Sequence, residues 1–423
     1  MIATVQKGCL SGEIPAIASK SYAHRLLMAA ALADRPTTVR CATVSDDILA
    51  TARVLTAMGA SVERTDEGFV VEPISTCPVG PTLDCGESGT TERFILPIAC
   101  ALGLDAAVTG SGRLPERPLS PLYEELQAHG IDLSPQGVFP LHARGRLPAG
   151  DYSLAADVSS QFIGGLLFAL SVVPGKSTLT LTGRIESAPY IDMTLDVLAL
   201  FGASITRTDD GRRFEIEGRT RLASPGAAAV EGDWSGASYL LAAGAIGPRP
   251  VRIEGLRADS LQGDRVMLDI LRDMGARIDI EPDAVTVHPS ELRGVVADMS
   301  RCPDLVPTVA VVAAHASGPT RLWNAAHLRI KECDRIAVPA QELSKVGVRC
   351  DEHDDGLTIH GDPALASRLH SLDGIAFSAH GDHRIAMSLA LLELRGGRLT
   401  LDDPSCVSKS FPNFWECWGQ VRV

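Results

Sequence analysis

Six short polar segments of this chain combine helix-capping residues with groups that could hold an anion. They are residues 19–21, 86–90, 159–161, 232–235, 302–304 and 381–384. Capping of a helix N-terminus accounts for their Ser, Thr and Asp residues. It does not require the cations in or just after them, which are Lys20, Arg25, Arg93 and Arg384. Because a helix N-terminus already carries partial positive charge, cations there are unfavourable unless an anion binds. The pattern therefore predicts anion-binding sites.

Three further cationic segments strengthen this interpretation: residues 113–118 (RLPERP), 329–335 (RIKECDR) and 409–412 (KSFP). A mixed-charge run of this kind is usually a solvated helix face. Here, however, six of the 39 basic residues are lysines, and three of the six lie in these motifs: Lys20, Lys331 and Lys409. This concentration favours binding of multiply charged anions over an ordinary charged surface.

The overall composition excludes several other classes of protein. Hydrophobic residues make up 45% of the 423 residues and charged residues 22%, which is typical of a folded globular chain. The net charge of −13 argues against a general nucleic-acid or membrane-surface binder. We find no signal-peptide or membrane-spanning pattern, and the ten cysteines form no CxxC pair or zinc-type cluster. We therefore expect a cytoplasmic protein without a metal.

An internal repeat of about 72 residues organises the chain. Helix-like segments end in glycines at intervals of 71, 72, 73, 72 and 72 residues: Gly59, Gly130, Gly202, Gly275, Gly347 and Gly419. A glycine just past a helix is what a left-handed C-cap requires. Most are followed by a short hairpin and a second, more apolar helix. Each repeat is therefore predicted to be one α/β unit.

The sixth repeat stops at its first helix, and the missing strand and second helix are found at residues 2–14 and 19–32. Six units of this size exceed one hydrophobic core. We therefore expect two lobes of three units. Residues 19–230 would form the first lobe, and residues 231–423 with residues 1–18 would form the second.

Nine motifs occur in the order found in one enzyme family: SKSYAHR, SDD, GESGTTER, LPERP, SSQF, SAPYID, RIKECDR, DHRIAM and KSFP. Over nearly its whole length the chain resembles the 3-phosphoshikimate 1-carboxyvinyltransferase (EPSP synthase) family of enolpyruvyl transferases. The resemblance implies an α/β fold of six βαβαββ-type units, three per lobe, as inside-out α/β barrels closing on an interlobe cleft. It implies transfer of the enolpyruvyl group of phosphoenolpyruvate to the 5-hydroxyl of shikimate 3-phosphate, with release of phosphate, on the pathway to chorismate and the aromatic amino acids. No cofactor is implied.

The resemblance also assigns roles to individual residues. Those implied for shikimate 3-phosphate are Lys20, Ser21, Arg25, Ser159, Ser160, Gln161, Ser187, Asp304, His327 and Lys331, with Tyr190 beside them. Those implied for phosphoenolpyruvate are Lys20, Gly89, Arg93, Arg117, Gln161, Arg335, Arg384 and Lys409. Proton transfer is implied for Asp304, Glu332, Lys20 and His383. The chemistry fits these residue types, because two anions need a dense cationic lining and the reaction must remove one proton and add another.

Two departures from the family's pattern and two alternatives stay open at this stage. Ala18 replaces a common glycine and Glu87 a common asparagine, so sensitivity to phosphonate inhibitors does not follow from the resemblance. One alternative is a UDP-N-acetylglucosamine enolpyruvyl transferase, but the loop GSGRLPERP lacks the reactive cysteine of that relative. The other is a non-catalytic anion-binding relative. We expect a monomer whose partners are the two small-molecule substrates.

Overall fold

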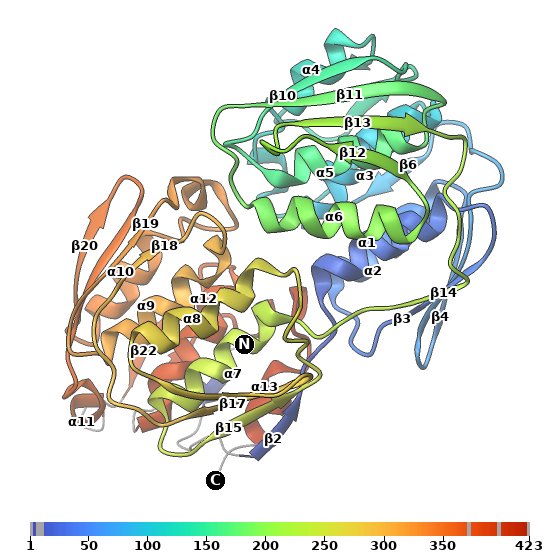
Figure 1. Cartoon of the computed structure of the whole chain (residues 1–423). Coiled ribbons are helices and arrows are strands. Elements are labelled where there is room, and N and C mark those ends of the chain that lie inside the picture. Colours follow the sequence, from blue (N-terminus) through green and yellow to red (C-terminus); the bar gives the residue numbers. More distant parts are fainter. Residues whose placement is uncertain (1–2, 6–11, 370–373, 396–398, 421–423) are drawn as a thin grey trace. The chain divides into compact units, whose positions relative to one another are not determined.

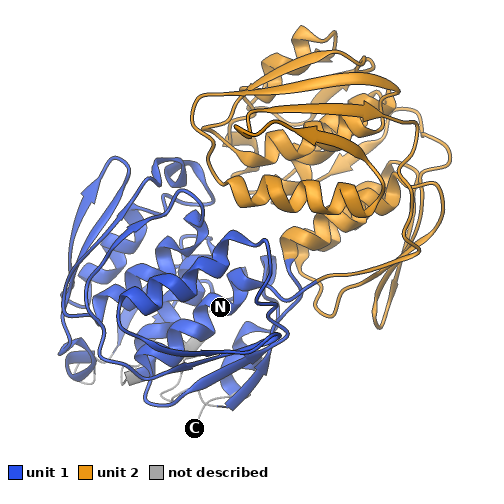
Figure 2. Ribbon diagram, viewed as in Figure 1, with its two compact units in different colours: residues 1–19, 231–423 blue, residues 20–230 orange. Residues whose placement is uncertain are grey.

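The computed structural model describes residues 3–5, 12–369, 374–395 and 399–420. The chain forms two compact units, which Figure 2 distinguishes by colour. Unit 1 comprises residues 1–19 and 231–423, and unit 2 comprises residues 20–230. Helices and strands alternate in both units, so the expected mixed α/β fold is confirmed.

Unit 2 contains three α/β repeats. Its helices are α1 (Lys20–Ala31), α2 (Asp46–Ala57), α3 (Gly89–Leu102), η1 (Leu114–Glu116), α4 (Leu122–Ala128), α5 (Ser160–Ser171) and α6 (Ala188–Leu200). Its strands are β3 (Thr37–Arg40), β4 (Ser61–Thr65), β5 (Gly68–Glu72), β6 (Thr82–Asp84), β7 (Ala106–Thr109), β8 (Asp132–Leu133), β9 (Leu141–Arg144), β10 (Asp151–Ala155), β11 (Gly175–Thr182), β12 (Ser204–Arg207), β13 (Arg213–Gly218) and β14 (Ala227–Ala229).

Unit 1 repeats the same alternation. Its α-helices are α7 (Trp234–Ile246), α8 (Met267–Asp273), α9 (Val306–Ala314), α10 (Ala337–Ser344), α11 (Leu365–Leu369), α12 (His383–Ala390) and α13 (Phe414–Gln420). Its 3₁₀ helices are η2 (Gly263–Val266), η3 (Pro303–Leu305), η4 (Ala326–Ile330), η5 (Leu391–Arg395) and η6 (Pro404–Lys409). Its strands are β1 (Ala3–Val5), β2 (Gly12–Pro15), β15 (Val251–Glu254), β16 (Arg277–Ile280), β17 (Ala284–His288), β18 (Val296–Asp298), β19 (Gly318–Trp323), β20 (Arg349–His353), β21 (Gly356–Gly361), β22 (Ile375–Phe377) and β23 (Leu399–Leu401).

The strands of the described residues form six small sheets, and none of them closes into a barrel. Five sheets share one pattern, in which the first pair of strands is parallel and the next two pairs are antiparallel. Their orders are β14-β3-β5-β4, β6-β7-β9-β8, β10-β11-β13-β12, β2-β15-β17-β16 and β18-β19-β21-β20. This common pattern is the structural counterpart of the 72-residue repeat.

The N-terminal segment joins the sheets of unit 1 at two places. Strand β1 pairs antiparallel with β23, with Ala3 opposite Leu401, in the sixth sheet. Strand β2 pairs parallel with β15, with Gly12 opposite Val251. Residues from the two ends of the chain therefore complete one unit together.

The second helix of each repeat lies inside its unit, and α5 and α7 are apolar on nearly every side. All thirteen residues of α7 are buried, as are eleven of the twelve residues of α5. A helix that is apolar all round must be enclosed, and Figure 1 shows β10, β11, β13 and β12 lying across α5. The inner helices α1, α3, α5, α7 and α12 begin within or directly after the polar segments that the sequence singled out, and α9 follows η3 in the same way.

The repeated glycines close five of the six outer helices as expected. Gly59, Gly130, Gly202, Gly275 and Gly347 all have φ between 70° and 104°, the left-handed conformation that glycine adopts most easily. The sixth expectation is wrong, because Gly419 lies inside α13. A glycine costs a helix only about 1 kcal/mol relative to alanine, which is too little to end it unaided.

The two segments of unit 1 that lead to unit 2 are hydrogen-bonded to each other. The Ser19 N–H donates to the Glu231 carbonyl at 2.8 Å, and Ala18 bridges Gly232. The buried amide of Gln262 joins both segments. Its Oε1 accepts from Ser19 Oγ at 3.0 Å, and its Nε2 donates to the Glu231 carboxylate at 2.6 Å. The Gln262 side chain thus holds both of the segments that lead out of unit 1.

Close packing between α3 and α5 sets the positions of the polar residues at their N-termini. A Cβ added at Gly165 would lie 2.4 Å from the Arg93 carbonyl oxygen and 2.9 Å from Pro97 Cγ. At Gly164 it would lie 2.5 Å from Phe94 Cζ. The missing side chains therefore allow the two helices to touch backbone to backbone.

We predict that Gly165→Ala destabilises the protein by about 1–3 kcal/mol, because the α3 backbone must move to admit the methyl group. Gly150→Ala is the matched control, since a Cβ at Gly150 meets nothing within 4 Å. Urea unfolding measures both variants. Equal stability of the two would show that α3 and α5 are not in tight contact.

Candidate functional site

Arg335, which follows η4 in unit 1, is buried and bonded to three carboxylates. Its Nε donates to Asp382 Oδ2 at 2.7 Å, and its Nη2 donates to Asp382 Oδ1 at 3.1 Å and Glu332 Oε2 at 2.9 Å. Its Nη1 donates to Asp304 Oδ1 at 3.0 Å. A buried guanidinium is tolerated only with such partners, because an unpaired buried charge is very unfavourable.

A second arginine, Arg384 in the first turn of α12, reaches the same aspartate. Its Nη2 donates to Asp304 Oδ2 at 2.7 Å, and its Nη1 donates to Ser235 Oγ at 2.6 Å. Its backbone N–H donates to Asp382 Oδ1 at 2.9 Å, so Asp382 caps the helix. Asp304 therefore accepts one bond from each arginine, one on each carboxylate oxygen.

This pairing controls the ionisation of Asp304. Burial alone would raise its pKa, but the charges of Arg384, Arg335 and Lys331 hold the pKa of the carboxyl well below its usual range. Burial alone would lower the pKa of Arg335, and the neighbouring carboxylates raise it instead. Asp304 and the two arginines are thus ionised at neutral pH.

The remaining residues predicted for this unit lie around the cluster. Lys409, at the end of η6, is buried with its Nζ 3.7 Å from Glu332 Oε1. His383, at the start of α12, is buried with its Nδ1 3.7 Å from Asp382 Oδ1. His327 is half-buried on η4, four residues before Lys331. The structure therefore brings Glu332, Lys409 and His383 to the same group of carboxylates and arginines.

Sequence reasoning missed three members of this cluster. Asp382 was interpreted only as part of a capping segment, although its carboxylate holds Arg335 and caps the helix of Arg384. Ser235 was likewise interpreted as part of a capping segment. Asp264 on η2 belongs to no motif that we singled out, and only its place near the Asp304 pair draws attention to it.

Unit 2 has its own pair of arginines, Arg93 and Arg117, at the first turn of α3. Arg93 Nη1 donates to Gln161 Oε1 at 2.9 Å, its Nη2 donates to the Pro118 carbonyl at 3.1 Å, and its guanidinium lies over the Phe162 ring at 5.1 Å. Gln161 Nε2 donates to Thr90 Oγ1 at 2.8 Å. These contacts join the first turns of the two helices.

Arg117 lies directly against the N-terminus of α3. A Cβ at Gly89 would lie 2.5 Å from Arg117 Nη1, so this approach requires glycine at position 89. Ser159 caps the neighbouring helix α5, where its side chain accepts from the Gln161 N–H, and Ser160 begins that helix. A guanidinium beside a helix N-terminus provides the donors and the positive charge that a phosphate or carboxylate needs.

The first turn of α1 holds Lys20 and Ser21. Lys20 Nζ contacts Asp47 Oδ2 at 2.8 Å, and the lysine side chain is 16% exposed. The partner is at the start of α2, within unit 2. Lys20 is therefore held near the surface of its unit by a carboxylate, close to where an anionic ligand would compete for it.

Arg25, one turn later on α1, is almost completely buried. It donates to Thr194 Oγ1 at 2.9 Å and to the carbonyls of Ser21 and Tyr190 at 2.7 and 3.0 Å. Burial lowers its pKa to about 10, so it still carries its charge at neutral pH. Ser187, before α6, is a non-glycine residue with φ of 55°, a strained conformation of the kind that functional sites often retain.

Two glutamates near α3 bear on anion binding in unit 2. Glu87, noted in the sequence, is exposed with its carboxylate against Gly112. Glu92, which sequence reasoning missed, is buried inside α3, and burial raises its pKa to about 7 against the opposing charges of Arg93 and Arg117. Its signal in the sequence is an acidic residue directly before Arg93, at the end of the motif GESGTTER and just before the apolar part of the helix.

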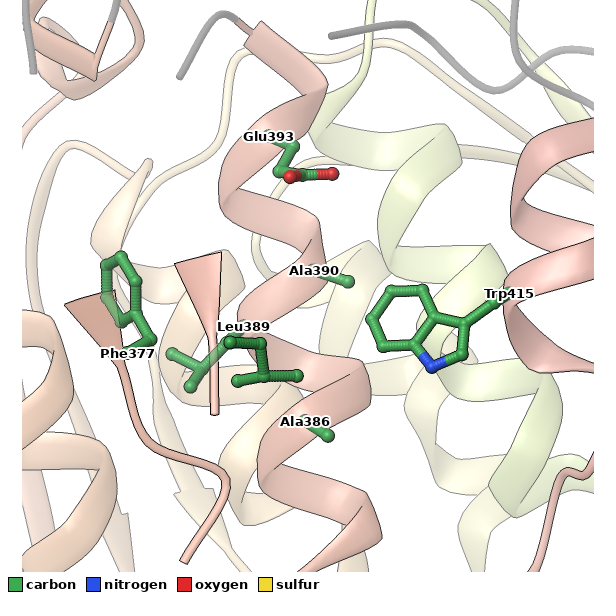
Figure 3. A pocket seen from close by; sticks show the side chains of 7 residues that line it. Phe377, Ala386, Leu389, Ala390, Glu393 and Trp415 are labelled. Atoms are coloured by element: carbon green, nitrogen blue, oxygen red, sulfur yellow. The ribbon is translucent and has the colours of Figure 1, made fainter. Parts of the chain in front are cut away.

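A small hollow in unit 1 has a different character (Figure 3). It is lined by Phe377, Ala386, Leu389, Ala390, Glu393, Leu401 and Trp415, which are apolar apart from one acid. Ala386, Ala390 and Glu393 lie on one face of their helix and line the hollow, whereas Arg384 lies on a different face. This hollow offers no cation to an anion, so it is not a candidate for the predicted chemistry.

The fold and these clusters define an α/β repeat protein that presents arginines at helix N-termini for binding anions. The particular family is established by comparison. Residues 5–418 match the family described as EPSP synthase (3-phosphoshikimate 1-carboxyvinyltransferase), and the chain belongs to that family. Among the described residues no helix is long and apolar enough to cross a membrane.

Relatives with this family name cover almost the whole chain. The 3-phosphoshikimate 1-carboxyvinyltransferase of Halobacterium salinarum is 40% identical, over 98% of this chain and 97% of its own. That of Clostridium kluyveri is 38% identical, over 96% and 94%. An EPSP synthase structure from Acinetobacter baumannii matches with a TM-score of 0.80 at 26% identity, over 100% and 98% of the chains. The enolpyruvyl transferase NikO of Streptomyces tendae has a TM-score of 0.79 at 22% identity, which shows a shared fold.

The family expected from the nine motifs is therefore confirmed, and with it the identity of the chain as a transferase of that family. The alternative of a UDP-N-acetylglucosamine enolpyruvyl transferase has less support. The individual residue roles remain predictions.

We predict that Asp382→Ala destabilises the protein by about 3–5 kcal/mol, because it leaves the buried Arg335 without two of its bonds. Asp259→Ala is the matched control, since Asp259 forms an exposed ion pair with Arg257 and should contribute little. Chemical denaturation of both variants measures the difference. If Asp382→Ala unfolds at the wild-type denaturant concentration, the buried network does not hold this unit together.

Proposed function

We propose that this chain transfers the enolpyruvyl group of phosphoenolpyruvate to the 5-hydroxyl of shikimate 3-phosphate, releasing phosphate. The observation that carries the proposal is the half-buried carboxylate of Asp304, which is held by Arg335 and Arg384 beside Lys331. It combines a proton acceptor with fixed cations in one place, as a reaction between two anions requires.

A phosphate-release assay tests this proposal. Phosphoenolpyruvate is supplied with shikimate 3-phosphate in one reaction and with UDP-N-acetylglucosamine in the other. We expect turnover only with shikimate 3-phosphate. Turnover with the nucleotide sugar alone would contradict the proposal, and release with neither acceptor would favour a non-catalytic anion-binding protein.

The proposed binding residues divide by substrate. Shikimate 3-phosphate would contact Lys20, Ser21, Arg25, Ser159, Ser160, Gln161, Ser187, Asp304, His327 and Lys331. Phosphoenolpyruvate would contact Lys20, Gly89, Arg93, Arg117, Gln161, Arg335, Arg384 and Lys409. Both sets include residues of both units.

The reaction needs two proton transfers and one leaving group. Asp304 would accept the proton of the 5-hydroxyl as the hydroxyl oxygen bonds to the enol carbon, while an acid adds a proton to the methylene carbon. Loss of phosphate and of one proton from the new methyl group then restores the double bond. Glu332, Lys20 and His383 are the candidates for the acid. Nothing is oxidised or reduced in this scheme, so it needs no redox cofactor. We also propose that the enzyme is monomeric and cytoplasmic.

Substrate binding would also change the basicity of Asp304. In the structure two arginines and Lys331 hold its pKa so low that it is a poor base near neutral pH. An anion on Arg384 and Arg335 offsets part of their positive charge, which raises the pKa of Asp304. Asp304 therefore becomes an effective proton acceptor only when the substrates are present.

We predict that Asp304→Asn lowers kcat by about 10²–10⁴-fold while shikimate 3-phosphate binding is largely kept, because the amide has the same shape but cannot accept the proton. Steady-state kinetics and calorimetric titration of the variant measure the two effects. A near-normal kcat would remove Asp304 from the proposed role.

We predict that Lys409→Ala in unit 1 and Arg117→Ala in unit 2 each raise KM for phosphoenolpyruvate, with a smaller effect on shikimate 3-phosphate measured alone, because both cations are assigned to the phosphoenolpyruvate anion. Lys176→Ala, whose side chain is 88% exposed, is the control for removal of a positive charge. A variant that leaves KM for phosphoenolpyruvate unchanged would contradict the assignment of its own cation.

A further inference from the structure

Four completely buried polar side chains of unit 2, none of them assigned to a substrate, form a series of hydrogen bonds. His24 Nδ1 lies 2.6 Å from Thr51 Oγ1, which in turn lies 2.7 Å from Thr91 Oγ1. Thr91 Oγ1 donates to Ser88 Oγ at 2.8 Å. We call these four residues the His24 network.

The number of hydroxyl protons fixes the direction of each bond in the His24 network. A hydroxyl group has one proton to donate, and Thr91 gives its proton to Ser88. Thr51 must therefore donate to Thr91. Because the Thr51 proton is used in this way, the bond between His24 and Thr51 needs a proton on His24 Nδ1.

The other ring nitrogen of His24 carries no proton. Nε2 is buried and has no hydrogen-bond partner, so an N–H group there would lack an acceptor, which is unfavourable. Burial lowers the pKa of His24 to about 3 against the charge of Asp47, and the charges of Lys20 and Arg25 act in the same direction as burial. His24 is thus a neutral imidazole whose single N–H donates to Thr51.

The His24 network joins the N-terminal halves of three helices. His24 lies on α1, Thr51 on α2 and Thr91 on α3, and α2 packs against both of the other helices. Ser88 is the N-cap of α3, where its Oγ also accepts from the Thr91 backbone N–H at 3.3 Å. The cap of α3 is therefore bonded, through two threonines, to a histidine on α1.

We propose that His24 is a positioning residue for phosphoenolpyruvate, which holds the first turn of α3 in place by donating through Thr51 to Thr91. This inference rests on the proposed function, in which Gly89 and Arg93 of that turn bind phosphoenolpyruvate. His24 acts through the helix and does not itself touch the substrate.

A displacement of the first turn of α3 would disturb the groups assigned to phosphoenolpyruvate. Thr90 Oγ1 accepts from Gln161 Nε2 at 2.8 Å, and Arg93 Nη1 donates to Gln161 Oε1 at 2.9 Å. Gly89 lies against the guanidinium of Arg117. Movement of this turn therefore changes the position of Arg93 relative to Arg117.

Helix α1 has attachments that do not pass through the His24 network. Lys20 Nζ contacts Asp47 Oδ2 at 2.8 Å, and Arg25 donates to Thr194 Oγ1 at 2.9 Å and to the Tyr190 carbonyl at 3.0 Å. These contacts remain when the network is broken. The residues of α1 assigned to shikimate 3-phosphate should therefore be affected less than those of α3.

Thr51→Val tests the proposal, because it replaces the hydroxyl by a methyl group and breaks the network with little change of shape. We expect KM for phosphoenolpyruvate to rise about three- to tenfold, with little change in kcat or in the affinity for shikimate 3-phosphate measured alone. Thr51→Ser keeps the hydroxyl and should have a KM close to that of the wild type. An unchanged KM in Thr51→Val would overturn the proposal.

Two control variants separate positioning from general damage to unit 2. Thr56→Val makes the same substitution at an exposed position of α2, where the hydroxyl donates to the Ala52 carbonyl. Ile216→Val on β13 removes a buried methyl group outside the network and lowers stability. We expect both controls to keep the wild-type KM. An equal rise in KM with Ile216→Val would show that lost stability alone explains the effect, and would overturn the proposal.

Nitrogen-15 NMR of the histidine rings tests the network without turnover, with the His24 signals identified by their absence from His24→Asn. We expect a protonated Nδ1 and an unprotonated Nε2 in the ligand-free protein, unchanged between pH 8 and pH 5. A protonated Nε2 at neutral pH would overturn the proposal whether or not the chain is active. If the wild type shows the expected signals but no turnover with shikimate 3-phosphate, the proposed function fails alone, and calorimetric titration with phosphoenolpyruvate replaces KM in the comparison of variants.

Discussion

The sharing of Asp304 by Arg335 and Arg384 is the interaction on which unit 1 depends. A protein that binds anions in a buried place must store positive charge there before the ligand arrives, and isolated buried charge is not tolerated. The carboxylates of Asp304, Asp382 and Glu332 neutralise the two guanidinium groups in the meantime. The same bonds hold the arginines in fixed positions, so the two side chains lose little conformational freedom when a substrate binds.

Unit 2 stabilises its buried cations by different means. Arg93 lies over Phe162 and Arg25 over Phe94, each at 5.1 Å, and each also donates to a neutral side-chain oxygen. Arg117 lies on the N-terminus of α3, where the helix dipole adds to its charge.

Much of the fold could be predicted because the repeat imposes a strict period on glycines and apolar helices. The left-handed turns at Gly59 and Gly347 follow from the absence of a side chain in glycine, so they could be predicted from the regular spacing of the glycines. The site was predictable where residues lie in compact motifs such as RIKECDR. Asp264 was not, because its burial depends on the packing of η2 against α7 and α8, and a lone acid gives no local signal. The sequence predicted Asp382 as part of a helix cap. Its hydrogen bonds with Arg335 could not be predicted, because the two residues meet only in the folded unit.

In the ligand-free protein the arginine pair keeps Asp304 ionised, and the proposed chemistry of unit 1 depends on this. Carbon-13 NMR of protein labelled at the aspartate carboxyl carbons measures this directly, with the Asp304 resonance identified by its absence from Asp304→Asn. We predict that its chemical shift is that of a carboxylate and does not change between pH 8 and pH 5. A titration of that resonance within this range would show that the two arginines do not control the carboxyl, and would contradict the account.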